Sequence, residues 1–325
     1  MRAKGITYDT GWHNGLVSTR ESFERADVER DLRAIREDLR CTAVRITGGD
    51  LDRIELAARI AAGLGLEVWW SPFSGHLDAD ELHEVLVDCA DRAERSRLEG
   101  HEVVLVAGAE LTLCTAGFLP GATFAERMAL LGGDPGRLVE AVRGAGPALN
   151  AFLGRVVAGV RERFGGRVTY AAIPIEDVDW EPFDLVGLDL YRTAEIADRF
   201  AGAVEGVVAR GKPVAITEFG CATFRGAGDV GARAVGMVEW GEDGRTTGLR
   251  GDPVRDEAEQ AGVVLELLDV FEAAGVDSAF LCTFSCHHLA GEFDAASYGV
   301  VRALDERRWE PKAAFHAVGE RYGRG

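Results

Sequence analysis

The sequence predicts a (β/α)8 barrel, and three observations support that fold class. Eight apolar runs of strand length occur along the 325 residues. Segments with helical apolar spacing separate most of these runs, which is the signature of a parallel sheet. Neither GxGxxG nor a P-loop follows any run, so the usual reason to expect an open nucleotide-binding sheet is missing.

The predicted strands follow one another at regular intervals, at residues 3–9, 42–47, 66–71, 102–108, 167–173, 184–191, 213–218 and 278–284. Apolar faces with a spacing of three and four residues predict helices, most clearly at 52–65, 259–275 and 310–322. The segment between the fifth and sixth strands is too short for a full helix, so a turn is expected there. The long connections follow strands four (109–145), seven (219–255) and eight (285–297). With no linker of low complexity, residues 1–325 are interpreted as one barrel domain.

Composition and charge limit the partners and the compartment. The formal net charge of −18 argues against binding to nucleic acid or to an anionic membrane surface. The N-terminus has no signal-peptide core, and no apolar run reaches membrane-spanning length. Six cysteines without CxxC pairs fit a reduced cytoplasm. Arginine greatly outnumbers lysine, which is typical of a GC-rich bacterium.

A carboxylate at the end of a buried strand needs a partner, solvent or a function, and two predicted strands end in this way. The run "PVAITEFG" leads to Glu218, and "VVLVAGAE" leads to Glu110. Strict alternation would place Val214, Ile216 and Glu218 on the inner face of the barrel. Strands four and seven are three apart in the ring, so both glutamates are expected to meet across the mouth. A separation of roughly 5–6 Å would suit a retaining glycosidase.

Four short motifs carry a resemblance to the clan of (β/α)8 glycoside hydrolases that have catalytic glutamates on strands four and seven. They are "AVRIT", "VAGAEL", "GLDLY" and "ITEFG", in strand order. The resemblance implies that Glu110 is the acid/base and Glu218 the nucleophile. It also implies that Arg45 keeps Glu218 ionised and that Tyr191 orients Glu218, with Asp189 beside it on strand six.

Two positions depart from this clan. Ala109 stands where the clan usually has an asparagine that contacts the sugar 2-hydroxyl. The end of strand eight reads "CTFSCHH" and lacks the tryptophan that usually forms a sugar platform. Both departures weaken the sugar-binding part of the resemblance more than its acid–base part.

Further carboxylates and rings are expected near the same rim. Asp9, Glu176 and Asp189 join the two glutamates, and Arg45 and Arg192 are the expected counter-charges in preference to a metal. Supporting or substrate-binding roles are also expected for Trp12, for Trp70 and for one histidine after strand eight, His287. The acidic, glycine-containing segment 238–257 is expected to form a mobile lid.

The first hypothesis is therefore a hydrolase for a glycosidic bond, acting on a carbohydrate or other small molecule without a cofactor or metal. A second is the same barrel adapted to another acid–base reaction, such as cyclisation or elimination on a specialised metabolite, with or without Mg²⁺. A third is a binding barrel without catalysis. The sequence indicates neither the substrate nor the oligomeric state.

Overall fold

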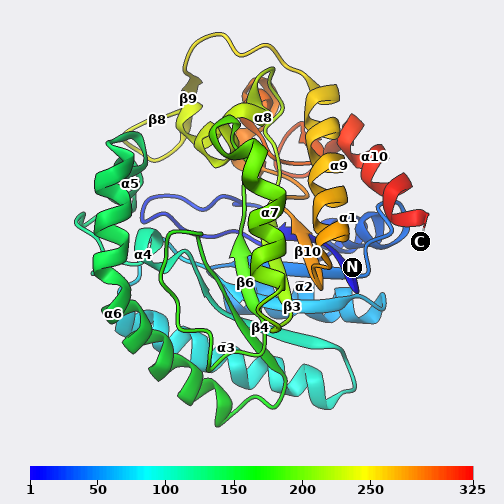
Figure 1. Ribbon diagram of the computed structural model, residues 1–325. Helices are drawn as coiled ribbons and strands as arrows, with labels where there is room; N and C mark the ends of the chain where they lie inside the picture. The colour runs from blue at the N-terminus through cyan, green and yellow to red at the C-terminus, as the bar shows by residue number, and fades with distance from the viewer. Residues whose placement is uncertain (325) are drawn as a thin grey trace.

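The computed structural model describes residues 1–324, in which eight parallel strands form a barrel (Figure 1). The strands are β1 (Ala3–Asp9), β2 (Ala43–Gly48), β3 (Glu67–Pro72), β4 (Val103–Ala109), β5 (Arg167–Ala171), β6 (Val186–Asp189), β7 (Val214–Phe219) and β10 (Ser278–Leu281). Their hydrogen-bonded order is β5-β4-β3-β2-β1-β10-β7-β6. A parallel bridge between Ala172 and Leu188 closes the ring between β5 and β6. The predicted fold class is confirmed.

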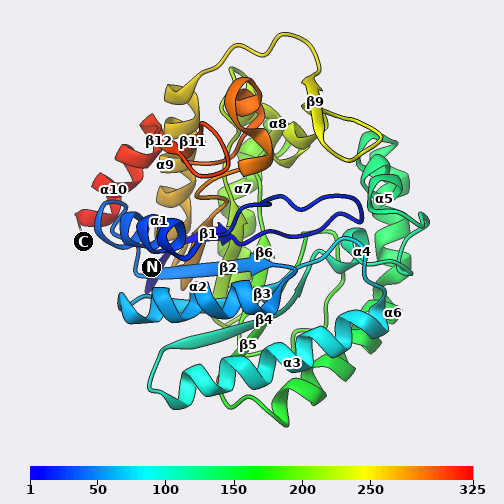
Figure 2. The same ribbon diagram turned by 180° about the vertical axis from the view of Figure 1, so that it is seen from behind.

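Within residues 1–324, seven helices surround the barrel. Figure 2 shows the barrel from behind. They are α1 (Arg25–Glu37), α2 (Leu51–Gly63), α3 (Ala79–Leu98), α6 (Pro135–Arg161), α7 (Ala197–Val208), α9 (Glu257–Ala274) and α10 (Ala313–Gly323). Within residues 1–324 no helix lies between β5 and β6, as the short segment predicted. The side chains of Asp50 and Asp78 accept backbone N–H groups at the starts of α2 and α3, which defines where these helices begin. In the part of the chain described, no helix is both long and apolar enough to cross a bilayer.

Side chains of each strand alternate between the helix layer and the barrel interior. In β2, Val44 and Ile46 join the large core under the helices, whereas Ala43 belongs to the smaller interior core. That interior is filled mainly by small residues around two rings, Trp69 and Phe280, whose centroids lie 4.5 Å apart. The barrel interior around these two rings is therefore a packed core, and the space for a ligand must lie at the mouth of the barrel.

The strand that carries Glu218 does not alternate strictly, which corrects the sequence-based expectation. Val214 and Ile216 face the helix layer, not the interior. Leu188 pairs with Ile216 but the next residue, Asp189, pairs with Glu218, so Thr217 is an extra residue in β7. This bulge returns Glu218 to the inner side.

Strand β4 has a similar irregularity before Glu110. Val106 pairs with Thr169 and Ala109 pairs with Ala171, so β4 contains one residue more than β5 over this interval. Gly108, at φ +106°, adopts the backbone conformation that this irregularity requires. Both glutamates thus follow a register shift.

The long connections form small elements at the carboxyl end of the barrel. After β4 come α4 (Leu111–Cys114), α5 (Phe124–Ala129) and η1 (Leu130–Gly132), and after β6 comes η2 (Ala194–Ile196). After β7 come α8 (Ala227–Val230), η3 (Gly231–Met237) and the hairpin β8 (Val238–Trp240)–β9 (Thr246–Leu249). After β10 come η4 (His287–Leu289), η5 (Gly291–Ala296) and the pair β11 (Val301–Ala303)–β12 (Trp309–Pro311). In both ribbon views the loop between β1 and α1 extends toward α5 (Figures 1 and 2).

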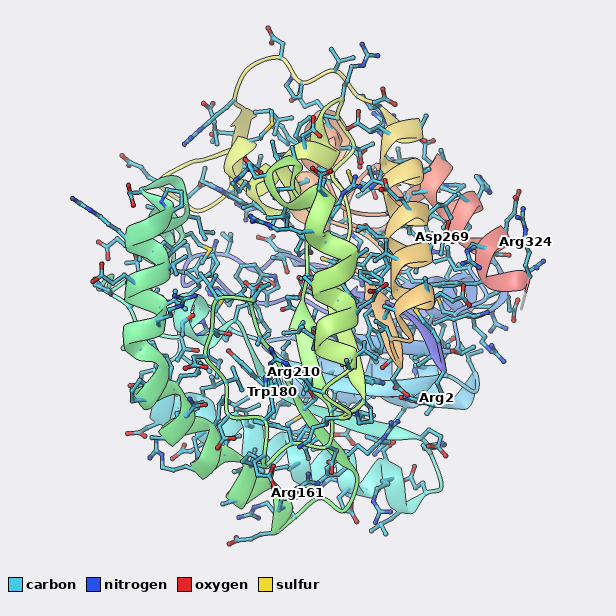
Figure 3. All side chains as sticks on the ribbon, viewed as in Figure 1. Arg2, Arg161, Trp180, Arg210, Asp269 and Arg324 are labelled. Carbon is cyan, nitrogen blue, oxygen red and sulfur yellow. The ribbon has the colours of Figure 1, made fainter. Side chains whose placement is uncertain are left out.

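An ion-pair network ties the strands together at the opposite end, where Figure 3 labels Arg2. Arg2 pairs with Glu67 at the start of β3 and, at 3.1 Å, with Asp277 just before β10. Glu67 also pairs with Arg167 at the start of β5 and accepts the indole N–H of Trp69. In this fold, that end serves stability and the carboxyl end serves chemistry.

Candidate active site

Glu218 at the end of β7 is held by two donors from different strands. Nη1 of Arg45, on β2, donates to Oε1 at 3.0 Å, and the hydroxyl of Tyr191 donates to Oε2 at 3.2 Å. Arg45 is 1% exposed, and it also donates to Oγ of Ser71 and to the carbonyl of Thr217. The side chain of Glu218 retains 24% exposure. Glu218 is therefore held by a buried cation on one side and stays accessible on the other.

Asp189 at the end of β6 lies beside this pair but is closed off from solvent. Its Oδ1 accepts a 2.6 Å hydrogen bond from Thr217 and lies 3.8 Å from Arg45. Its Oδ2 is buried and has no hydrogen-bond partner among residues 1–324. Burial and the neighbouring charge of Glu218 raise the pKa of Asp189 to about 8. Because this side chain is closed off from solvent, Asp189 supports the site from beneath.

Glu110 brings a third carboxylate to the same point. One oxygen from each of Glu110, Asp189 and Glu218 lies within 4.8 Å of the other two. Burial raises the pKa of Glu110 well above its ordinary value, and the charges of Asp189, Glu218 and Glu176 add to this effect. The arrangement therefore pairs a carboxyl group whose pKa is raised with a carboxylate that is hydrogen-bonded to a cation.

Glu176, after β5, is part of the support for Glu110. Its Oε1 accepts from the backbone N–H of Thr112 at 3.1 Å and from the Thr112 hydroxyl at 2.7 Å. Its Oε2 accepts from the hydroxyl of Tyr170 at 2.9 Å and from the N–H of Ile173 at 3.2 Å. Sequence reasoning placed Glu176 only as a rim carboxylate, because its contact with Thr112 joins residues that are far apart in the chain.

Arg127 is a supporting residue that no sequence pattern indicated. It is fully buried and donates to the carbonyls of Leu113 and Cys114 at the end of α4. It also donates to the carbonyl of Gly75 in the loop after β3. These bonds satisfy carbonyls that a short helix leaves free, and they hold α4 against its neighbouring loop.

Two predicted residues lie at the end of β1 and in the loop that follows it. Asp9 accepts from the N–H of Gly11 at 2.8 Å and from the hydroxyl of Thr19 at 2.6 Å, so it fixes this loop. The half-buried ring of Trp12 packs edge-on against Phe73 and Phe124, with centroids 5.0 and 5.2 Å apart. Trp12 thereby joins the loops after β1, β3 and β4 at the mouth.

Two other predictions are corrected by the structure. Trp70 is fully buried in the core between the barrel and the helices, where no ligand reaches it. Its neighbour Trp69 points inward but lies in the packed interior, so neither ring forms a platform. His287 is buried, and burial with the charges of Arg20, His288 and Arg30 lowers its pKa to about 3. No hydrogen bond, within residues 1–324, links His287 to the three carboxylates.

The segment expected to be a lid contains the β8–β9 hairpin. Trp240 is 51% exposed and stacks on His288, with centroids 6.0 Å apart. Arg245 pairs with Glu21 of the loop after β1, and the Thr246 hydroxyl donates to the carbonyl of His288. The hairpin is thus attached to loops on both sides by few contacts, and its role as a lid stays a prediction.

The three clustered carboxylates would also be the residues to hold a divalent cation, since oxygen ligands suit Mg²⁺. Arg45 already supplies a positive charge to Glu218 and lies near Asp189. A second cation would be repelled by it at short range. Asp9 and Glu176 are not part of this group.

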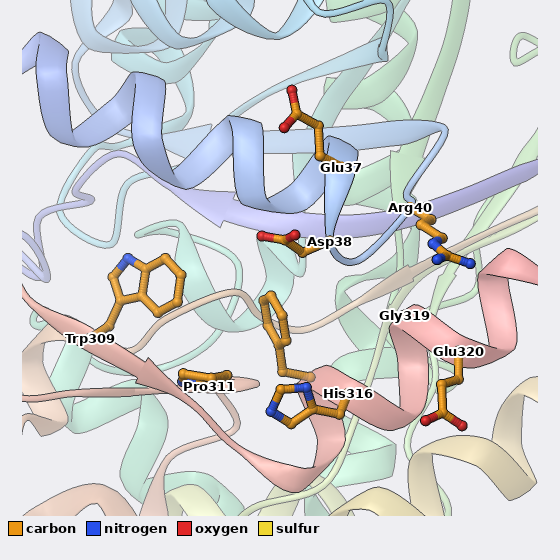
Figure 4. Close-up of a pocket in the computed structure, with 9 residues that line it drawn as sticks. Glu37, Asp38, Arg40, Trp309, Pro311, His316, Gly319 and Glu320 are labelled. Carbon is orange, nitrogen blue, oxygen red and sulfur yellow. The ribbon is translucent and has the colours of Figure 1, made fainter.

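A separate groove lies on the outside of the molecule, between the end of α1 and α10 (Figure 4). Its lining includes Asp38 and Arg40 on one side and Trp309 and His316 on the other. None of the predicted site residues lines it.

Comparison with solved structures shows that the barrel is similar in fold to those of several glycoside hydrolases. A GH113 β-1,4-mannanase is similar over 100% of this chain and 99% of its own, with a TM-score of 0.65 and 18% identity. The GH113 β-mannanase from Alicyclobacillus acidocaldarius, in complex with ManMIm, is similar over 98% and 96%, with a TM-score of 0.63 and 17% identity. For a β-glucuronidase from Ruminococcus gnavus the TM-score is 0.59 at 14% identity, over 100% of this chain and 51% of the enzyme. No protein-family model matches the sequence, and no curated protein does. At these identities the likeness establishes a glycosidase-like (β/α)8 fold.

Proposed function

We propose that the protein hydrolyses a glycosidic bond with retention of configuration, with Glu110 as acid/base and Glu218 as nucleophile. The observation that carries this proposal is the approach of Glu110 to Glu218, with carboxylate oxygens within 4.8 Å. Retaining enzymes hold their two carboxyl groups about 5–5.5 Å apart, whereas inverting enzymes leave about 6.5–9.5 Å for a water molecule.

The different surroundings of the two glutamates assign the steps. Glu110, whose pKa is raised, donates its proton to the leaving oxygen while Glu218 attacks the anomeric carbon. The product is a glycosyl ester on Glu218, and the C–O bond to the leaving group is broken. Glu110, now ionised, removes a proton from water, which attacks the same carbon and releases Glu218. Arg45 and Tyr191 hold Glu218 in position throughout.

Replacement of each glutamate tests this assignment on activated aryl glycosides, beginning with 4-nitrophenyl β-mannoside and β-glucuronide. Glu218→Ala is expected to lose turnover by at least ~10³-fold, because no glycosyl ester can form. Azide should restore part of the activity and yield a glycosyl azide of inverted configuration. Glu110→Ala should keep most of its activity with 2,4-dinitrophenyl leaving groups and lose it with phenyl ones, because only the latter need protonation.

Wild-type protein carried through the same azide assay is the control. Equal losses in both variants, with no rescue by azide and no dependence on the leaving group, would contradict the two roles.

A second candidate is another acid–base reaction, with or without a metal ion, in the same barrel. Ala109 favours it, because this 2%-exposed residue offers no hydrogen-bonding group to a sugar 2-hydroxyl. The third carboxylate, Asp189, also favours it, since a two-glutamate displacement does not need one.

Metal analysis separates the two candidates. With Arg45 next to Glu218, we expect purified protein to contain less than stoichiometric metal and its activity to be unchanged by EDTA. Stoichiometric metal, or activity lost to EDTA and restored by Mg²⁺, would favour the second candidate.

A further inference from the structure

We propose that Glu176 is a positioning residue for the acid/base, because it fixes the left-handed turn that aims Glu110 at Glu218. The inference rests on the proposed function and assigns a role to a carboxylate that takes no part in the chemistry.

Glu110 has an unusual backbone conformation. Its φ and ψ are 47° and 41°, in the left-handed region that residues with a side chain rarely adopt. In residues 1–324 only one other residue besides glycine, Arg40, has a positive φ. Such a conformation persists only where surrounding contacts enforce it.

The contacts that enforce it converge on Glu176. The N–H groups of the two residues after Glu110 are both hydrogen-bonded. That of Leu111 donates to the hydroxyl of Tyr170 at 2.8 Å, and that of Thr112 donates to Glu176. Tyr170 in turn donates to Glu176. Glu176 thus holds the two residues that follow the turn, Thr112 directly and Leu111 through the hydroxyl of Tyr170.

All four groups that contact Glu176 are donors, and this requires a carboxylate. An ionised carboxylate accepts all four hydrogen bonds, whereas the amide nitrogen of glutamine would face a donor. The side chain is 8% exposed, so a lost bond would not be replaced fully by water.

The same carboxylate acts on Glu110 through its charge. The titratable and charged groups that face Glu110 come from five parts of the chain and are Arg45 on β2, Cys114 on α4, Tyr170 and Glu176 on and after β5, Asp189 on β6 and Glu218 on β7. Burial and the charges of Asp189 and Glu218 raise the pKa of Glu110 most, the charge of Glu176 raises it further, and Arg45 lowers it. Loss of the Glu176 charge should therefore make Glu110 a stronger acid.

NMR titration tests the inference without a substrate, on protein labelled with ¹³C in the glutamate carboxyl groups. The Glu110 signal is identified by its loss in Glu110→Gln. In Glu176→Gln the acid dissociation constant of Glu110 should rise about tenfold, because one nearby negative charge is removed. Asp31→Asn is the matched control, since Asp31 is fully buried and accepts from Tyr8, Arg20 and Trp309 in the helix layer. The control should leave the Glu110 titration unchanged.

Steady-state kinetics then test whether Glu176 positions Glu110 for proton transfer. Glu176→Gln should lower kcat about tenfold or more for a phenyl glycoside, with KM nearly unchanged, and lower it much less for a 2,4-dinitrophenyl glycoside. Thr112→Val removes only the hydroxyl donor to Glu176 and should give a smaller loss of the same kind. If Glu176→Gln does not fold, Thr112→Val is used in its place.

An unchanged Glu110 titration in Glu176→Gln would overturn the inference, as would equal losses on both glycosides. A protein that hydrolyses no glycoside but shows the shifted titration would contradict the proposed function and support the link between Glu176 and Glu110.

Discussion

Among the single residues of the site, Asp189 has the least favourable surroundings. It is buried between Arg45 and Glu218, and one of its oxygens has no partner within residues 1–324. An isolated buried charge costs much free energy, so a group in this position favours its protonated form. Asp189 therefore lowers the stability of the fold at alkaline pH.

Replacement of Asp189 by asparagine tests this conclusion. The pKa of Asp189 is raised from 3.8 to about 8, so the native state binds more protons than the unfolded state between these values. The free energy of unfolding therefore falls as pH rises through this interval. Asp189→Asn cannot lose a proton and keeps an acceptor for Thr217. It should exceed wild type in stability by on the order of 1–3 kcal/mol at pH 8 and by less at pH 5.

Urea denaturation at pH 5 and pH 8 measures both values. An equal change of stability with pH in the variant and in wild type would show that Asp189 is not the group responsible.

At the level of the elements, register shifts in β4 and β7 determine where the two glutamates point. A one-residue shift moves a side chain to the other face of a sheet. If β7 alternated strictly, with no bulge at Thr217, Glu218 would point into the helix layer with Val214 and Ile216. Arg45 needs no such irregularity, because β2 pairs regularly with β1 and β3. The site thus combines one regular strand with two irregular ones.

The whole molecule separates stability from chemistry along the barrel axis. The Arg2 network ties β1, β3 and β10 at one end, while the three carboxylates converge at the other. Between them lies the interior around Trp69 and Phe280, in which a Cβ on Gly5 would come within 2.4 Å of the Phe280 ring. A change at the Arg2 end should therefore alter stability without changing the site.

Arg2→Met is the corresponding prediction. The side chain of Arg2 is 41% exposed, so solvent weakens its ion pairs and the loss should be on the order of 1 kcal/mol. The kinetic constants, or the binding of any ligand at the mouth, should match wild type. Urea denaturation and a parallel assay measure the two properties. A variant with full stability and impaired activity would contradict this separation.

The sequence by itself determined the order of the strands, the missing helix between β5 and β6, and the strand ends that carry carboxylates. It did so because apolar periodicity is a local property, and the carboxyl ends of parallel strands all lie at one end of a barrel. Glu218 was selected as a strand-end carboxylate, whereas Arg45 and Tyr191 were selected through a resemblance in short motifs. The structure brings their side chains into hydrogen-bond contact.

Only the tertiary structure decided which way several of these side chains point and how deeply they are buried. Trp70 faces the helices. Glu218 faces inward only because β7 has one residue more than β6 where the two strands pair. Glu176 and Asp189 acquire their roles from partners that come from distant parts of the chain. Strand pairing and burial depend on residues that folding brings together, and no local pattern of amino acids contains that information.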